Sequence, residues 1–172
     1  MEAYEAILGR RSIRAYSDKL VPADIVRRIC NAGLYAASGN GMQSTIVVAV
    51  SDKGTRDKMS ALNAAVLGQE GDPFYGAPVV LTVLARAEAG THLQDGSLTM
   101  ATLMLAARAE GLGSCWVHRA KEQFEGEEGR VLYRELGIPE GYVGIGNCIL
   151  GYPADGFPEA DARHEGRVIE IA

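Results

Sequence analysis

Continuous apolar runs along the chain predict three buried strands. They cover residues 46–50, 77–84 and 142–151, and the first two are rich in β-branched residues. Pro78 lies at the start of its run, where its missing N–H removes no bond from a sheet. The third run carries several glycines, so we expect another part of the molecule to pack closely against it.

Segments with helical spacing separate these strands. Apolar side chains recur every three or four positions over about 23–37, and shorter or more mixed patterns cover 2–9 and 53–67. The charged stretch 119–134 predicts a pair of solvent-facing helices. This alternation indicates an α/β or α+β protein, with helices layered on a sheet.

The segment 95–118 predicts a central helix followed by a short strand. Asp95 opens it with the composition of a helix start, and residues 98–107 are almost all apolar, which is typical of a helix buried on every side. Gly111 ends the helix, and 113–118 predicts a strand that leaves the core. An ordinary core helix with a glycine C-cap would give the same pattern.

Composition narrows the class of protein. With 172 residues, 47% of them apolar and 23% charged, we expect one soluble globular domain over 1–172. The net charge of −5 argues against a general nucleic-acid or anionic-membrane surface. Neither a signal-peptide pattern nor an uncharged run near about 18 residues is present, so we expect a cytoplasmic protein. The three cysteines have no metal-ligand spacing and predict buried free thiols: Cys30, Cys115 and Cys148.

A basic cluster follows the first predicted helix. Arg10, Arg11, Ser12 and Arg14 place three guanidinium groups and a hydroxyl within five residues. A guanidinium can donate two parallel hydrogen bonds to a phosphate, so the cluster could bind an anion. A solvated basic turn is the alternative interpretation.

Two loops carry further candidate chemistry. The polar loop 38–44 offers side-chain amides that could pair with a heterocyclic edge, or it is an ordinary connection between helix and strand. The loop 68–76 is rich in glycine and carries Phe74 and Tyr75. It could border a substrate pocket as a mobile segment, or its two aromatic side chains could pin it down.

Four motifs, taken in this order, resemble the FMN-dependent nitroreductase family in its short single-domain form. They are RRSIRAYSD at 10–18, SGNGMQS at 38–44, GLGSCWVHRAK at 111–121 and GIGNCILGYP at 144–153. The resemblance runs essentially from end to end. It implies the nitroreductase fold, a mostly antiparallel sheet flanked by helices, in an intertwined homodimer with two FMN molecules at its interface.

The resemblance also assigns roles to residues. Arg10, Arg11 and Ser12 would hold the FMN phosphate, and Arg14 would face the pyrimidine edge of the flavin. Backbone N–H groups around Val117 to Arg119 would donate to flavin N5. The complete set of expected cofactor residues is Arg10, Arg11, Ser12, Arg14, Asn40, Gln43, Ser44, Cys115, Trp116, Val117, His118, Arg163 and His164. The family places an Asn two residues before the Gln, but Gly41 holds that position here.

By resemblance, the function is an oxidoreductase that uses NADH or NADPH to reduce an electron-poor acceptor, nitroaromatic or quinone-like, by a ping-pong hydride mechanism. No side chain is expected to act as acid, base, nucleophile or metal ligand, and Cys115 is assigned to packing because no base lies at a readable spacing. His118 and Tyr75 are the candidate substrate contacts. A flavin-binding or flavin-sensing dimer without turnover remains open, as does a dehydrogenation or reductive dehalogenation on the same flavin.

Overall fold

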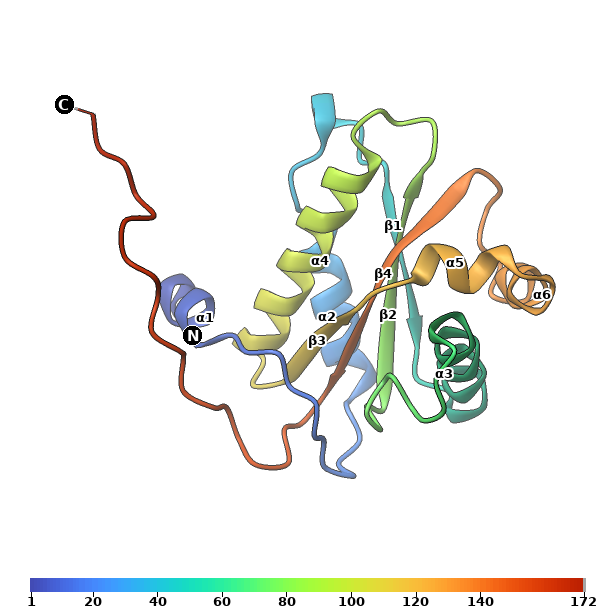
Figure 1. Ribbon diagram of the computed structural model, residues 1–172, viewed down its shortest axis with the longest axis horizontal. Coiled ribbons are helices and arrows are strands. Elements are labelled where there is room, and N and C mark those ends of the chain that lie inside the picture. The colour runs from blue at the N-terminus through green and yellow to red at the C-terminus, as the bar shows by residue number, and fades with distance from the viewer. Residues whose placement is uncertain (172) are drawn as a thin grey trace.

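A four-stranded antiparallel sheet with the order β1-β2-β4-β3 forms the centre of the computed structural model, which describes residues 1–171. Two helices cover one face of the sheet and three cover the other, which makes the three layers expected (Figure 1). The strands are β1 (Thr45–Val50), β2 (Val79–Arg86), β3 (Gly113–Val117) and β4 (Tyr142–Gly151). The predicted α+β class is confirmed.

Helices α2 and α4 lie on one face of the sheet, and α3, α5 and α6 lie on the other (Figure 1). Helix α1 stands apart from both layers beside the end of α4 (Figure 1). The bounds are α1 (Ala3–Gly9), α2 (Ala23–Gly33), α3 (Lys53–Leu67), α4 (His92–Ala109), α5 (Ala120–Glu125) and α6 (Glu127–Glu135), with a short 3-10 turn at Gly39–Gly41.

The glycines of β4 admit close neighbours, as predicted. A Cβ on Gly146 would lie 2.2 Å from Nε1 of Trp116, and a Cβ on Gly144 would lie 2.4 Å from the backbone of Ala120. Both distances are far shorter than a van der Waals contact, so glycine is required at each position. The neighbours are the adjacent strand β3 and the first residue of α5.

Three sequence expectations about helices are wrong. Helix α2 ends at Gly33 rather than near residue 37, because the chain turns there over the following residues. Helix α4 begins at His92, so Asp95 lies inside its first turn rather than at its cap. Within one chain α4 is also not buried on every side. Met100 and Leu103 are fully buried, whereas Leu98 is 46% exposed.

The chain beyond β4 forms an extended tail that leaves the sheet and passes α1 (Figure 1). Phe157 of this tail lies under the guanidinium of Arg108 at the end of α4, 3.7 Å from the ring centroid. Residues 168–171 form no strand in this chain and are exposed. Among residues 1–171, no helix is long and apolar enough to cross a bilayer.

Candidate active site

A cavity of about 450 Å³ lies between the end of β3 and the loop 68–76. One wall is formed by Arg14 and the segment 115–119, and the other by the end of α3 and residues 69–73 and 75. Its volume is within the range of small-molecule sites. Of the expected cofactor and substrate contacts, the structure brings together here Arg14, Tyr75, Cys115, Trp116, Val117 and His118.

The basic segment reaches this cavity because it runs along the free edge of β3. Ser12 pairs with Ser114 in a parallel bridge, and the N–H of Ile13 donates to the carbonyl of Ser114 at 3.0 Å. A Cβ on Gly113 would lie 2.7 Å from Ile13, so the close approach requires glycine in β3. Arg14 follows directly and lines the cavity, while Arg10, Arg11 and Ser12 lie further back along the same edge.

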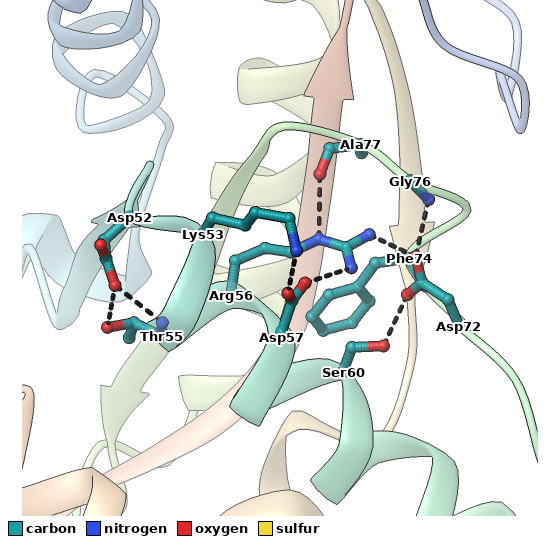
Figure 2. A network of polar contacts seen from close by, with 10 residues as sticks. All are labelled: Asp52, Lys53, Thr55, Arg56, Asp57, Ser60, Asp72, Phe74, Gly76 and Ala77. Carbon is teal, nitrogen blue, oxygen red and sulfur yellow. Dashed lines mark hydrogen bonds and ion pairs between the residues drawn. The ribbon is translucent and has the colours of Figure 1, made fainter. Parts of the chain in front are cut away.

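The opposite wall is held by one carboxylate. Asp72 Oδ1 accepts hydrogen bonds from the hydroxyl of Ser60 and from the N–H of Phe74 at 2.9 Å. Its Oδ2 accepts from Arg56 Nη2 and from the N–H of Gly76 at 2.7 Å (Figure 2). Two of these donors come from α3 and two from the loop itself. A single side chain therefore fixes both the shape of the loop and its position on the helix.

Arg56 completes this network from within α3. Its side chain is only 8% exposed, its Nε donates to the carbonyl of Ala77 at 3.0 Å, and its guanidinium lies 5.6 Å from the ring centroid of Phe74 (Figure 2). Phe74 itself is fully buried. Each interpretation of the loop therefore holds in part: the loop borders the cavity, and Phe74 fixes it to the core, whereas Tyr75 is 45% exposed.

The electrostatics of Asp72 follow from the same contacts. Burial alone would raise the pKa of this carboxyl, but the hydrogen bonds from Arg56, Ser60 and two backbone N–H groups outweigh burial and hold its pKa below the ordinary value. Asp72 is therefore ionised near neutral pH and holds its four donors as a carboxylate.

Unusual backbone conformations gather at the candidate residues. Among residues 1–171, the non-glycine positions with positive φ are Asn40 (52°), Gln43 (48°), Tyr75 (53°) and Arg119 (70°). Such conformations are disfavoured for residues with a Cβ and concentrate at functional sites. Tyr75 and Arg119 line the cavity, and the guanidinium of Arg14 lies 6.0 Å from the ring centroid of Tyr75.

The loop 38–44 does not reach this cavity within one chain. Gln43 lines a separate, open hollow beside the end of α2, together with Leu34 to Ser38 and Gly41. Ser44 is buried, and its hydroxyl donates to Asp95 at 2.6 Å. Asp95 also accepts from the N–H of Gly39 at 2.9 Å. Hydrogen bonds from Ser44 and Gly39 lower the pKa of Asp95, so this carboxylate anchors the loop instead of capping α4.

Arg163 and His164 are also away from the cavity, on the exposed tail. Conversely, the structure adds two residues that the sequence interpretation did not select, and one side chain. Asp72 lines the cavity and shapes its loop wall, and Asn63 donates to the carbonyl of His118 on the other wall. Arg119 was expected only as a backbone donor, but its residue also lines the cavity.

Among the described residues, the Cys115 thiol has no base as a hydrogen-bonding partner, and no metal site is present. Cys115 is buried, and its Sγ contacts only the carbonyl of Trp116 at 3.8 Å among hydrogen-bonding partners in residues 1–171. Burial raises the pKa of Cys148 far above that of a free thiol and that of Cys30 to about 11. In the same part of the chain, no group of three or more His, Cys, Asp or Glu side chains could hold a metal ion.

Comparison with known proteins places this architecture. The model of the Nitroreductase family matches residues 7–73 and 63–152. A protein of Archaeoglobus fulgidus named "Putative NADH dehydrogenase/NAD(P)H nitroreductase" is 34% identical over 167 residues, which cover 94% of this chain and 92% of that protein. The crystal structure of a nitroreductase with bound FMN from Bacteroides fragilis is 26% identical, with a TM-score of 0.89 over 100% of this chain and 99% of the other.

Two further relatives support the comparison. A nitroreductase with bound FMN from Desulfitobacterium hafniense has the same fold, with a TM-score of 0.88 over the whole of both chains at 23% identity. An FMN reductase (NADPH) of Bacillus subtilis is 22% identical over 168 residues, which cover 88% of this chain and 66% of that protein.

Proposed function

This chain belongs to the nitroreductase family, and we propose that it is an FMN-dependent oxidoreductase that uses NADH or NADPH to reduce an electron-poor acceptor, a nitroaromatic or quinone-like compound. The observation that carries this proposal is the cavity between the segment 115–119 and the loop 68–76. In this cavity two cationic side chains, Arg14 and Arg119, lie beside the apolar end of β3. The family and the FMN-bound structural relatives support the choice of cofactor. The extent of 1–172 as one domain stays a prediction.

The residues at the cavity fit a flavin. Arg119 Nε is buried and has no hydrogen-bond partner among residues 1–171, although it borders the cavity, so a donor is left for a ligand. Arg11 Nε is also buried without a hydrogen-bond partner among residues 1–171, although Arg11 does not line the cavity. Apolar side chains such as Val117 line the wall between these cations, which suits a flat aromatic ring.

We assign the binding roles along one edge of the sheet. Arg10, Arg11 and Ser12 hold the phosphate, because guanidinium and hydroxyl donors make charge-assisted bonds to its oxygens. Arg14 lies at the cavity and provides a cation beside the heterocycle, where it stabilises the negative charge that reduction adds. The backbone of Val117 to Arg119 supplies N–H donors.

When bound, FMN supplies the hydride and two-electron chemistry that side chains lack. The protein's own residues orient the ring, keep a cation beside it and leave one open wall for donor and acceptor. Tyr75 and His118 lie on opposite walls of the cavity and are the proposed contacts to the second molecule. Cys115 is assigned to packing, because no base lies beside its thiol among the described residues.

The site requires a second copy of the chain, and we propose a homodimer. Gln43 and its loop lie away from the cavity in one chain, so the partner's loop would have to complete the site. Several apolar side chains also stand exposed on α1, α4 and the tail, as expected of an interface in a larger assembly. They are Tyr4 (78%), Ile7 (55%), Leu8 (67%), Leu98 (46%), Ile169 (86%) and Ile171 (94%).

We predict that dimerisation and FMN binding are coupled. Leu98→Glu would place a charge on the exposed face of α4, and it should produce monomers that have lost FMN, because half of each site comes from the partner. Sedimentation at micromolar concentration, with absorbance read at a flavin band, measures both properties in one run. Val131→Glu, at an apolar residue on α6 that is 43% exposed, is the matched control and should stay dimeric. A stable monomer that keeps its FMN would contradict the shared site.

A further inference from the structure

We propose that Asn63 is a positioning residue that fixes the peptide between His118 and Arg119, so that the N–H of Arg119 faces the ligand in the cavity. This inference rests on the proposed flavin site and concerns how that site is held. Asn63 lies on α3, and no motif of the sequence pointed to it. Its side-chain partner Gln123 lies on α5 and is bonded in turn by Asn147 of β4, so three elements meet behind the cavity wall.

A series of buried side-chain amides, linked by hydrogen bonds, supports the proposal. Asn63 Nδ2 donates to the carbonyl of His118 at 2.9 Å and to Gln123 Oε1 at 3.1 Å. Asn147 Nδ2 donates to the same Gln123 oxygen at 3.0 Å. On β2, Thr82 donates to Asn147 Oδ1 at 2.7 Å and ties the series to the centre of the sheet. Asn63, Asn147 and Thr82 are fully buried, and Gln123 is 2% exposed.

Stability alone gives a poor account of this cluster. Asn63 Oδ1 and Gln123 Nε2 are buried and have no hydrogen-bond partner among residues 1–171. A partly satisfied polar cluster stabilises a fold less well than apolar side chains of the same size. The cluster does fix the orientation of its side chains, since each hydrogen bond between amides orients the next group. Among residues 1–171, the backbone group to which a side chain of this cluster donates is the carbonyl of His118 at the cavity wall.

The geometry of the peptide group links the orientation of the His118 carbonyl to that of the next N–H. In a trans peptide, the carbonyl of one residue and the N–H of the next point to opposite sides. The carbonyl of His118 is directed at Asn63 inside the protein. The N–H of Arg119 therefore lies on the other side of this peptide group from Asn63, and both residues of the peptide line the cavity.

The backbone at Arg119 needs such support. Its φ of 70° is in the left-handed region, which is disfavoured for a residue with a Cβ. Arg119 is the N-cap of α5, and the N–H of Gln123 donates to its carbonyl at 2.9 Å. Gln123 thus holds Arg119 from the helix side, while Asn63 holds the preceding carbonyl.

The test compares FMN affinity with stability in matched variants. Asn63→Leu removes the donor but keeps the volume, and Asn63→Asp keeps the shape but offers no N–H in its ionised form. Apoprotein titrated with FMN, followed by flavin fluorescence, should show a dissociation constant raised about tenfold in both, the equivalent of one misplaced hydrogen bond. Thr99→Val is the control: it breaks the buried bond to Thr45 at 3.0 Å, far from the cavity.

The urea midpoint of each apoprotein separates positioning from folding. We expect Thr99→Val to lower the midpoint as much as the Asn63 variants do, while its FMN affinity stays within about twofold of the parent. Equal losses of FMN affinity in the control and the Asn63 variants would overturn the proposal, because the effect would then be one of stability. So would unchanged affinity in Asn63→Leu. If Asn63→Leu does not fold, Asn63→Asp decides by the same criterion. If the parent apoprotein takes up no FMN, the proposed function itself fails.

Discussion

Replacing Arg10 and Arg14 together with Ala is expected to release FMN from the protein. Both residues lie on the segment that runs along the free edge of β3, and Arg14 lines the cavity directly. Each lost charge-assisted hydrogen bond to a phosphate or heterocycle oxygen weakens binding by about 1.5–3 kcal/mol. The two together should raise the FMN dissociation constant by a factor of about 10² to 10⁴. Titration of apoprotein with FMN at constant ionic strength measures this directly.

A control with the same change in net charge is available on the far helices. Arg27 on α2 and Arg134 on α6 are exposed and outside the cavity, so Arg27→Ala with Arg134→Ala should leave FMN affinity nearly unchanged. Binding that falls equally in both double variants would show a general charge effect rather than a site. Unchanged affinity in the Arg10 and Arg14 variant would make the assignment of this motif wrong.

Replacing Asp72 with Ala is expected to lower the free energy of unfolding by about 2–3 kcal/mol. The change removes the acceptor of Arg56 Nη2 on a buried guanidinium and leaves two backbone N–H groups of the loop without their acceptor. This loss of stability is at the low end for breaking a buried ion pair, because the Asp72 side chain is 35% exposed and solvent screens its charge. Asp57→Ala is the matched control: its carboxylate also accepts from Arg56, at 3.1 Å, but is 44% exposed and screened by solvent, so its loss should lower stability less than the loss of Asp72.

The contribution of Asp72 should also depend on pH. Its pKa in the folded protein is below the ordinary carboxyl value of about 3.9, so its stabilisation is fully present above that value and is lost as pH falls through the folded pKa. Urea unfolding of the parent and of Asp72→Asn should therefore converge in stability below about pH 4. A stability difference that stays constant down to pH 2 would contradict this role of the carboxylate.

Elements with a strong local pattern were predictable from the sequence. The strand at 142–151 and the helix at 53–67 have the predicted bounds, because a continuous apolar run and a helical spacing each need no distant partner to be recognised. Asp95 shows the opposite case. Its composition is that of a helix cap, but Ser44 and Gly39, more than 50 positions away, engage its carboxylate inside the helix. A tertiary contact of that kind leaves no local pattern.

The candidate site divides in the same way. The motifs led to Arg14 and to the segment 115–118, since each lies within one contiguous motif. In the structure both line one cavity. Asp72 and Asn63 escaped notice because their roles lie in contacts with residues 16 and 55 positions away. The loop at 68–76 was recognised as a border of the pocket by its aromatic residues, but its rigidity depends on the buried Arg56 in another element. Those interactions are visible only in three dimensions.

The central claim is that one cavity serves the hydride donor and the acceptor in turn, on bound FMN. The most direct measurement is the steady-state oxidation of NADH and NADPH by the FMN-loaded protein, with a quinone or nitroarene at several fixed concentrations. A shared cavity requires the oxidised nicotinamide to leave before the acceptor binds, so double-reciprocal plots should be parallel. Lines that intersect would show that both molecules bind together. A protein that holds FMN but oxidises neither NADH nor NADPH would contradict the assignment as an enzyme.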